Sequence, residues 1–259
     1  MKKFIVLLAK AALKAVKRCP GILKYVPKVF LLPICRFAVR NDIFALGYVP
    51  DGLKTLEICH AAIQKNGLAL SYVPEELKTQ ELCRMAVGKC GIALEDVPQA
   101  LKTPELCIAA VRDYGSALEY VPEALKTQEL CYIAVLCDPV ALEFVPEALK
   151  TSELCYFAVS GDLFGNFALE FVPEASKTPE ICLVAAWNDP AALGEFVPDE
   201  LKTPEICMNA VRNYGSALEF VPEERRTSAL CCVAVSDDPA AIKFVPERLK
   251  TQVERYTAR

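Results

Sequence analysis

The dipeptide Val-Pro recurs ten times along the chain, and its regular spacing constrains the fold more than any other feature. Successive prolines are 23, 24, 24, 24, 24, 27, 25, 24 and 24 residues apart. An aromatic residue precedes the dipeptide in every copy except at Asp96. Self-similarity at a fixed period of this length is the signature of a repeat array. The sequence therefore predicts about ten copies of one structural unit. The prolines are Pro27, Pro50, Pro74, Pro98, Pro122, Pro146, Pro173, Pro198, Pro222 and Pro246.

The local sequence of one copy predicts the structure of the unit. Thr103 is a good N-cap, and a proline at the first helical position favours a helix over Pro104–Tyr114 that stops at Gly115. Residues Ser116–Tyr120 can form a second short helix, and Pro122–Leu125 one further turn. Twenty-four residues are too few for two full helices, and no strand pattern is present. We therefore expect an all-α solenoid in which a long helix alternates with a short or 3-10-like one.

The repeated string resembles a known family. The segments ALEYVPEALKTQELC (117–131) and ALEFVPEALKTSELC (141–155) are similar to an uncharacterised tandem-repeat family of bacteria and giant viruses. The resemblance covers essentially the whole chain and is clearest from about Ala45 to Thr251. It implies repeat architecture and no activity, and it carries no catalytic residues that could be transferred to this chain.

Charge is distributed unevenly. Ten of the 29 Lys and Arg residues lie in Met1–Asn41, which holds none of the 33 Asp and Glu residues. The remainder of the chain holds all the Asp and Glu residues and is called here the acidic body. Its negative charge argues against nucleic acid as the main ligand, because contacts with phosphate groups dominate the affinity of proteins for nucleic acids. We expect one repeat domain over residues 1–259, with a basic, degenerate capping repeat at 1–41, regular repeats at 42–250 and a tail at 251–259.

The basic N-terminal segment has three interpretations. The simplest is a cap over the exposed end of the core. A membrane contact through Met1–Arg18 is an alternative that is not favoured, and pairing with the acidic body of another copy is a third. No transmembrane helix is expected, and Lys10 interrupts the apolar run that would otherwise resemble a signal peptide. An uncleaved, cytoplasmic protein is predicted.

Nine of the 13 cysteines occupy one position of the repeat. Packed helices lie about 8–10 Å apart, whereas a disulfide needs Cα atoms within about 7 Å. We therefore predict small, buried, free thiols, which favours a reducing compartment. They are Cys35, Cys59, Cys83, Cys107, Cys131, Cys155, Cys182, Cys207 and Cys231.

Helical phasing at 100° per residue separates a constant arc of the long helix from a variable one. The constant arc is predicted to form the core and consists of Leu106, Cys107, Ala110, Val111 and Tyr114 in one copy. The variable arc is the candidate binding surface and consists there of Ile108, Ala109 and Arg112.

The variable arc changes character along the chain. It is polar in the early repeats (Arg36, Arg40, His60, Gln64, Arg84) and again in the late ones (Asn209, Arg212, Ser236). The middle repeats are apolar and aromatic, which is typical of an interface. The predicted partner-binding residues are Tyr132, Ile133, Leu136, Tyr156, Phe157, Leu183 and Trp187, with Val184 beside them. The alternative is that the short helices cover this face, so that the aromatic residues belong to the core. The insertion GDLFGN (161–166) falls in the same region.

The residues needed for catalysis or metal binding are not found in the sequence. His60 is the single histidine, and no cysteine pair has zinc-finger spacing. No phosphate-binding or nucleophile motif is present, so neither enzyme activity nor a cofactor or metal is expected. A scaffold that binds a protein of unknown identity is the favoured function. A self-assembling protein whose basic head docks onto an acidic neighbour and a peripheral membrane adaptor are the alternatives.

Overall fold

A computed structural model describes residues 34–36, 38–39, 43–161, 168–188 and 190–257 of the chain. The basic segment Met1–Arg18, Arg40 and most of the insertion at 161–166 lie outside the described residues. Within the described ranges all regular structure is helical, which confirms the predicted all-α fold.

The chain folds into two compact units, Met1–Lys126 and Thr127–Arg259. The prediction of one domain with boundaries at residues 41 and 250 stays a prediction. The first unit contains η2 (Ile43–Tyr48), η3 (Asp51–Leu53), α3 (Leu56–Ile63), η4 (Gly67–Tyr72), η5 (Glu75–Leu77), α4 (Gln80–Val87), η6 (Gly91–Leu94), η7 (Gln99–Leu101), α5 (Pro104–Asp113), η8 (Gly115–Tyr120) and η9 (Glu123–Leu125), where η denotes a 3-10 helix.

The second unit repeats the same order of elements. It contains α6 (Gln128–Cys137), η10 (Pro139–Phe144), η11 (Glu147–Leu149), α7 (Ser152–Val159), η12 (Leu169–Phe171), η13 (Glu174–Ser176), α9 (Pro179–Asn188), α10 (Pro190–Glu195), η14 (Asp199–Leu201), α11 (Pro204–Asn213), η15 (Gly215–Phe220), η16 (Glu223–Arg225), α12 (Ser228–Asp237), η17 (Pro239–Phe244) and α13 (Glu247–Thr257).

Each regular repeat is a long α-helix followed by two 3-10 helices, as the sequence predicts. The threonine of the Lys-Thr dipeptide caps the long helix. Thr103 Oγ1 accepts a hydrogen bond from the Leu106 amide at 3.3 Å, and Pro104 fills the first helical position. The same capping bond recurs at Thr79, Thr127, Thr151, Thr178, Thr203 and Thr227.

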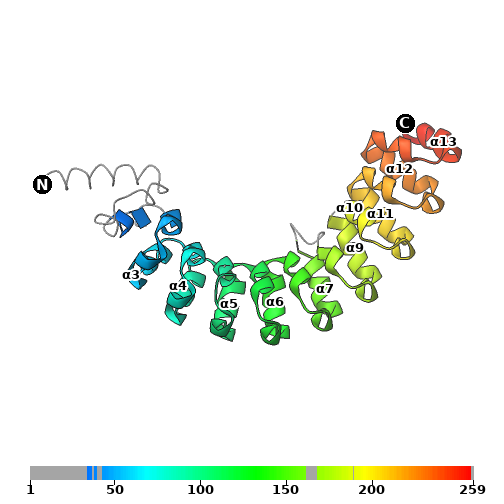
Figure 1. Cartoon of the computed structure of the whole chain (residues 1–259). Helices are drawn as coiled ribbons and strands as arrows, with labels where there is room; N and C mark the ends of the chain where they lie inside the picture. Colours follow the sequence, from blue (N-terminus) through cyan, green and yellow to red (C-terminus); the bar gives the residue numbers. More distant parts are fainter. Residues whose placement is uncertain (1–33, 37, 40–42, 162–167, 189, 258–259) are drawn as a thin grey trace, which may run out of the picture. The chain divides into compact units, whose positions relative to one another are not determined.

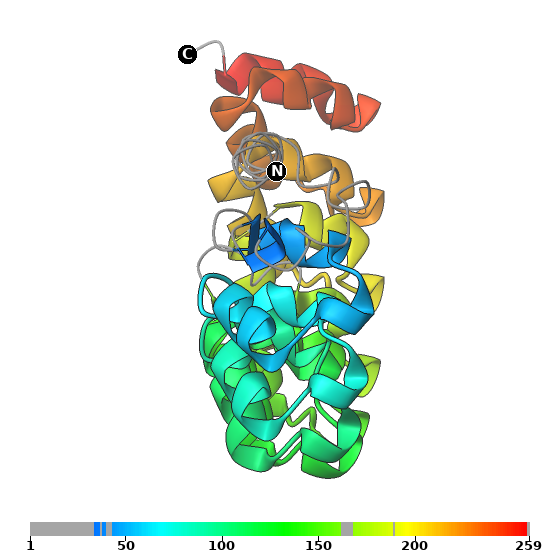
Figure 2. The same ribbon diagram turned by 60° about the vertical axis from the view of Figure 1, so that its left-hand side comes forward.

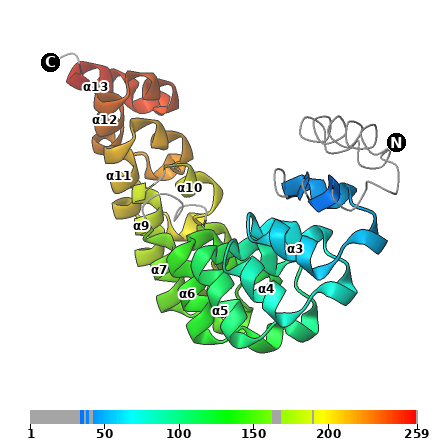
Figure 3. The ribbon, with the colours of Figure 1, turned by 90° about the vertical axis from the view of Figure 1, so that its left-hand side faces the viewer.

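Consecutive repeats stack side by side within each unit. In the first unit α3 packs on α4 and α4 on α5, while η2, η4, η6 and η8 form a second row. In the second unit α6, α7, α9, α11, α12 and α13 follow one another in the same way (Figure 1). The stacking is also visible after the ribbon is turned, in Figure 2 and Figure 3. Each unit is therefore an α-solenoid, in which every repeat buries its apolar face against its neighbours.

The constant arc of the long helices forms the core. Leu106, Cys107, Ala110 and Val111 are buried, whereas Ala109 and Arg112 on the variable arc are exposed. All nine repeat-position cysteines have an exposed fraction of 0% and form no disulfide, so the prediction of buried free thiols is confirmed. Small residues at these positions let neighbouring helices approach closely.

The assignment of Tyr114 to the core is wrong, because 41% of its side chain is exposed. Helix α5 ends at Asp113, and Tyr114 is its C-cap with φ −146° and ψ 103°. The backbone is extended there, so helical phasing no longer gives the direction of the side chain. Gly115 begins η8 rather than ending α5, and no described glycine has a positive φ.

The glycine that begins the short helix is required by a close approach of two backbones. A Cβ atom on Gly91 would lie 2.4 Å from the carbonyl oxygen of Ala110 in the next long helix. The same approach occurs at Gly67 and Gly215. The Gly91 amide also donates to Asp113 Oδ2 at 2.7 Å, which ties η6 to α5.

Gly91→Ala is expected to lower the free energy of unfolding by about 1–3 kcal/mol, the usual range for overpacking. The added methyl group meets a backbone carbonyl rather than a flexible side chain, so two repeats must move apart. Urea unfolding followed by circular dichroism measures the effect. Gly52→Ala is the matched control, because nothing lies within 4 Å of its Cβ position, and it should be neutral or slightly stabilising. Equal losses in both variants would contradict the close approach.

The 25-residue copy also has a local explanation. Relative to the other copies, Gly194 is an additional residue, and α10 replaces the usual 3-10 helix. The Val197 amide donates to Ala192 O at 3.1 Å, five residues back, whereas the equivalent Val121 amide donates only three residues back, to Leu118. The Phe196 amide donates to the same Ala192 oxygen at 3.0 Å. The inserted residue is thus absorbed by widening the last turn of the short helix.

A lysine whose role is not evident from the sequence links successive repeats. Lys78 Nζ forms an ion pair with Glu75 Oε1 at 2.6 Å and donates to Asp96 O of the next repeat at 2.7 Å, with only 7% of its side chain exposed. Equivalent bonds to the carbonyl of the next repeat are made by Lys102, Lys150, Lys177 and Arg226. Lysine in a loop is usually solvated, so composition alone does not predict this role.

Candidate functional site

The predicted partner-binding residues lie on three consecutive long helices of the second unit. We define the aromatic face as Tyr132, Ile133 and Leu136 on α6, Tyr156 and Phe157 on α7, and Leu183 and Trp187 on α9. Helix α6 packs on α7 and α7 on α9, so the three sets lie on neighbouring helices (Figure 1).

Much of the aromatic face is accessible. The exposed fractions are 40% for Tyr132, 58% for Leu136, 47% for Tyr156 and 54% for Trp187. Ile133, Phe157 and Leu183 are half-buried. The short helices therefore do not cover this face.

An aromatic contact joins α6 to α7. The rings of Tyr132 and Phe157 have centroids 5.2 Å apart and planes inclined by 31°. Aromatic pairs at this separation contribute about 0.5–1.5 kcal/mol beyond the area that they bury. The contact holds both side chains in place, so the exposed edge of Tyr132 is presented on a fixed support.

A groove of about 630 Å³ runs between α6 and α7 beside this pair. Tyr132 and Ile133 supply its apolar part, and the exposed carboxylates of Glu129 and Glu153 stand at its rim. The full lining is Gln128, Glu129, Tyr132, Ile133, Thr151, Glu153 and Leu154. An apolar groove with acidic edges can accept apolar side chains together with cations.

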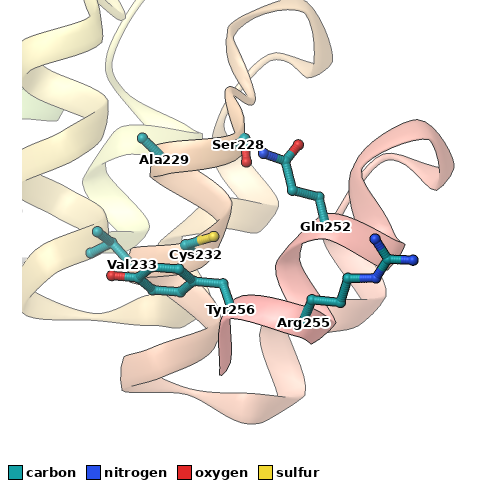
Figure 4. A pocket seen from close by; sticks show the side chains of 7 residues that line it. All are labelled: Ser228, Ala229, Cys232, Val233, Gln252, Arg255 and Tyr256. Atoms are coloured by element: carbon teal, nitrogen blue, oxygen red, sulfur yellow. The ribbon is translucent and has the colours of Figure 1, made fainter. Parts of the chain in front are cut away.

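A second groove, of about 610 Å³, lies between α12 and α13. Figure 4 shows the ring of Tyr256 reaching towards Val233 and Cys232, and Gln252 extending towards Ser228. The full lining is Ser228, Ala229, Cys232, Val233, Gln252, Arg255 and Tyr256. Its four α12 residues occupy the same repeat positions as the four α6 residues of the first groove. The groove between long helices thus recurs, with side chains that differ from one copy to another.

A smaller hollow of about 270 Å³ lies in the first unit, where Leu68, Tyr72 and Asp96 are among its lining residues. Burial raises the pKa of Asp96, and the nearby charge of Lys78 opposes that effect. Asp96 also departs from the consensus aromatic residue, and its carbonyl accepts the bond from Lys78.

Other exposed aromatic residues are placed differently. Tyr114 and Tyr214 are 41% and 45% exposed, but each is the C-cap residue of its helix and does not lie on the variable arc. They provide matched reference positions for the aromatic face.

The polar ends of the variable arc also lie at the surface. Arg36, Gln64, Arg84, Arg212 and Ser236 are exposed, whereas His60 and Asn209 are half-buried. Arg36 Nη2 pairs with Glu57 Oε2 at 2.5 Å, from one long helix to the first turn of the next. Arg40 lies outside the described residues.

The acidic rim of the groove was not predicted from the sequence. The first-turn glutamates recur in nearly every copy, and their preference for the positive end of a helix accounts for them as capping residues. Their position relative to the neighbouring helix becomes visible only in the stacked structure. The informative signal in the sequence is the two residues after the repeated cysteine, which face the same groove.

Neither a metal site nor a membrane-spanning helix is found in the part of the chain that the structure describes. No cluster of three or more His, Cys, Asp or Glu side chains there could hold a metal ion. None of the helices described combines the length and apolar character needed to cross a bilayer.

Comparison with known proteins gives a family match. The family model "Domain of unknown function (DUF4116)" matches residues 55–102, 103–150 and 195–226. No curated protein and no solved structure matches the chain. Two of the matched segments each span two consecutive 24-residue repeats, which agrees with the period found in the sequence. Over these three segments the chain is therefore similar to the uncharacterised family DUF4116, in tandem copies.

Proposed function

We propose that the chain is a non-catalytic scaffold whose aromatic face on α6, α7 and α9 binds a protein partner. One observation carries the proposal. Four large apolar or aromatic side chains, Tyr132, Leu136, Tyr156 and Trp187, are 40–58% exposed on adjacent helices, on the arc where other repeats carry polar residues. Exposed apolar patches rimmed by polar residues mark interaction sites in soluble proteins.

The physical chemistry of the face supports a protein rather than a small ligand. The groove between α6 and α7 is open, and the aromatic residues extend beyond it onto α9. Tyrosine and tryptophan are the residues that most often dominate the energy of protein interfaces. Each has only two side-chain torsions, so little conformational entropy is lost when the side chain is ordered on binding.

The cellular setting belongs to the same proposal. Nine fully buried free thiols support a reducing compartment, and we propose a cytoplasmic protein. We also propose that the chain catalyses no reaction, because its acidic residues recur with the repeat in structural positions rather than as a unique pair.

Tyr156→Ala is expected to weaken partner binding at least about 30-fold, since truncation of an interface hot spot costs about 2 kcal/mol or more. Tyr132→Ala should have a similar effect and also releases the contact with Phe157. The partner is captured from native cell extract with the tagged full chain and identified by mass spectrometry. Its affinity for each purified variant is then measured by isothermal titration.

Tyr214→Ala is the control for these variants, because its side chain is similarly exposed but it is the C-cap residue of α11 and not part of the aromatic face. It should bind the partner like the wild type. The proposal is wrong if Tyr156→Ala binds normally. It is also wrong if Tyr156→Ala lowers the free energy of unfolding by several kcal/mol, because the residue would then belong to the core.

A further inference from the structure

The chemistry of the α6–α7 groove is that of a site for a cationic, apolar segment. Tyr132 and Ile133 line it, and the exposed carboxylates of Glu129 and Glu153 stand beside them. Among the described residues neither carboxylate has an ion-pair partner. Two negative charges next to an apolar surface attract an occupant that carries both Lys or Arg and apolar side chains.

One ion pair in the first unit shows how a cation at this repeat position pairs with the next long helix. Arg36 follows the repeated Cys35, and its guanidinium pairs with Glu57 in the first turn of the next long helix at 2.5 Å. Tyr132 follows Cys131, and Glu153 is the corresponding first-turn glutamate of the next helix. At the α6–α7 groove the position equivalent to Arg36 is therefore occupied by the aromatic Tyr132. Glu153 can then pair with a cation from another molecule.

A segment with matching chemistry is present in the sequence of the chain itself. Met1–Arg18 has six Lys and Arg residues and no acidic residue. If phased at 100° per residue, Lys3, Lys10, Lys14 and Lys17 fall within one stripe about 60° wide. The rest of the segment is largely apolar, with the run Phe4–Ala9. The segment thus combines several cations with apolar side chains.

We propose that the α6–α7 groove binds the Met1–Arg18 segment of a second copy of this chain. The proposal rests on the proposed function and names the partner of the same face. Lysines of the segment pair with Glu129 and Glu153, and its apolar side chains cover Tyr132 and Ile133. Helices α3, α4 and α5 separate the segment from α6 in the sequence. Dependence of binding on protein concentration distinguishes a second copy from the same chain.

Sedimentation velocity of the full chain tests the proposal. Association should increase with protein concentration and weaken between about 50 and 500 mM salt, because the attraction between exposed charges is screened. Glu129→Lys/Glu153→Lys should weaken association at least about tenfold. Glu143→Lys/Glu170→Lys is the matched control, since it changes the net charge equally at exposed residues outside the groove. It should associate like the wild type.

A synthetic peptide of residues 1–18 provides a second readout that does not depend on removing a segment from the fold. The labelled peptide should bind the wild-type chain in fluorescence anisotropy and should bind Glu129→Lys/Glu153→Lys at least about tenfold more weakly. A peptide with Lys10→Glu and Lys14→Glu should lose binding to the wild type and regain it with the reversed groove.

The inference is wrong if the chain is a monomer at all concentrations. It is also wrong if the peptide binds the groove variant and the control variant equally, or if it binds anionic phosphatidylserine vesicles but not the chain. The proposed function is tested separately. If a different protein binds and Tyr156→Ala weakens it, the aromatic face is a binding site even though its partner is not a second copy.

Discussion

Raising the pH from 9 to 11 is expected to lower the free energy of unfolding by about 4 kcal/mol through two buried thiols alone. Burial raises the pKa of Cys155 and of Cys182 from 9.0 to about 11. Because the folded state holds the neutral thiol, this stabilisation is fully present below pH 9 and is lost as the pH rises through about 11. Each pKa unit corresponds to about 1.4 kcal/mol, and most of the loss is complete at pH 11. Both residues have an exposed fraction of 0%.

The variant Cys155→Ala/Cys182→Ala separates these thiols from other groups that titrate at high pH. Near pH 7 it should be less stable than the wild type, because two buried sulfur atoms are removed from a packed core. The difference should shrink above pH 9 and approach zero or reverse near pH 11. Urea unfolding at pH 7, 9, 10 and 11 measures both proteins. Parallel pH profiles would show that the thiols do not cause the alkaline loss.

Lys78→Met is expected to lower the free energy of unfolding by about 2–3 kcal/mol. The substitution keeps most of the aliphatic stem but removes the ammonium group that pairs with Glu75 and donates to Asp96 O of the next repeat. Hydrogen bonds to charged groups contribute about 1.5–3 kcal/mol, and the carbonyl loses its donor. Since the bond joins two repeats, its loss weakens their stacking.

Lys89→Met is the matched control for this effect. Lys89 belongs to the same unit, and its side chain is exposed. It should change the free energy of unfolding by less than about 0.5 kcal/mol, as is usual for surface substitutions. If Lys78→Met and Lys89→Met are equally stable in urea unfolding, the lysine does not hold successive repeats together.

The sequence was sufficient to predict the repeat, its caps and its core, because each depends on interactions within a few residues. Thr103 and Pro104 start a helix through local hydrogen bonding and a fixed φ, and the small constant residues identify the buried arc. The phasing failed at Tyr114, where the helix had already ended. A period of 3.6 residues holds only while the backbone stays helical.

Features that depend on the neighbouring repeat were not predicted. Gly115 is predicted to stop a helix, whereas its equivalent Gly91 faces the carbonyl of Ala110 in the next copy. The repeated string contains a lysine, but the sequence of one copy does not show that the partner of Lys78 lies in the following repeat. The groove between α6 and α7 is likewise formed by two copies, so its acidic rim cannot be seen in a single unit.

The sequence predicts the residues of the candidate site but not how exposed they are. Sequence patterns placed Tyr132, Tyr156 and Trp187 on the variable arc and left open whether the short helices cover them. The structure places the short helices in a separate row and leaves these side chains 40–54% exposed. Binding by this face stays a prediction.

Trp187 offers the most direct test of the proposed binding face, because it is the single tryptophan of the chain and lies on that face. The measurement is acrylamide quenching of its fluorescence with and without the captured partner, after subtraction of the same complex formed with Trp187→Phe. If the aromatic face binds the partner, the emission should shift to shorter wavelength and quenching should fall severalfold at saturation. Unchanged emission and quenching in a saturated complex would contradict the account.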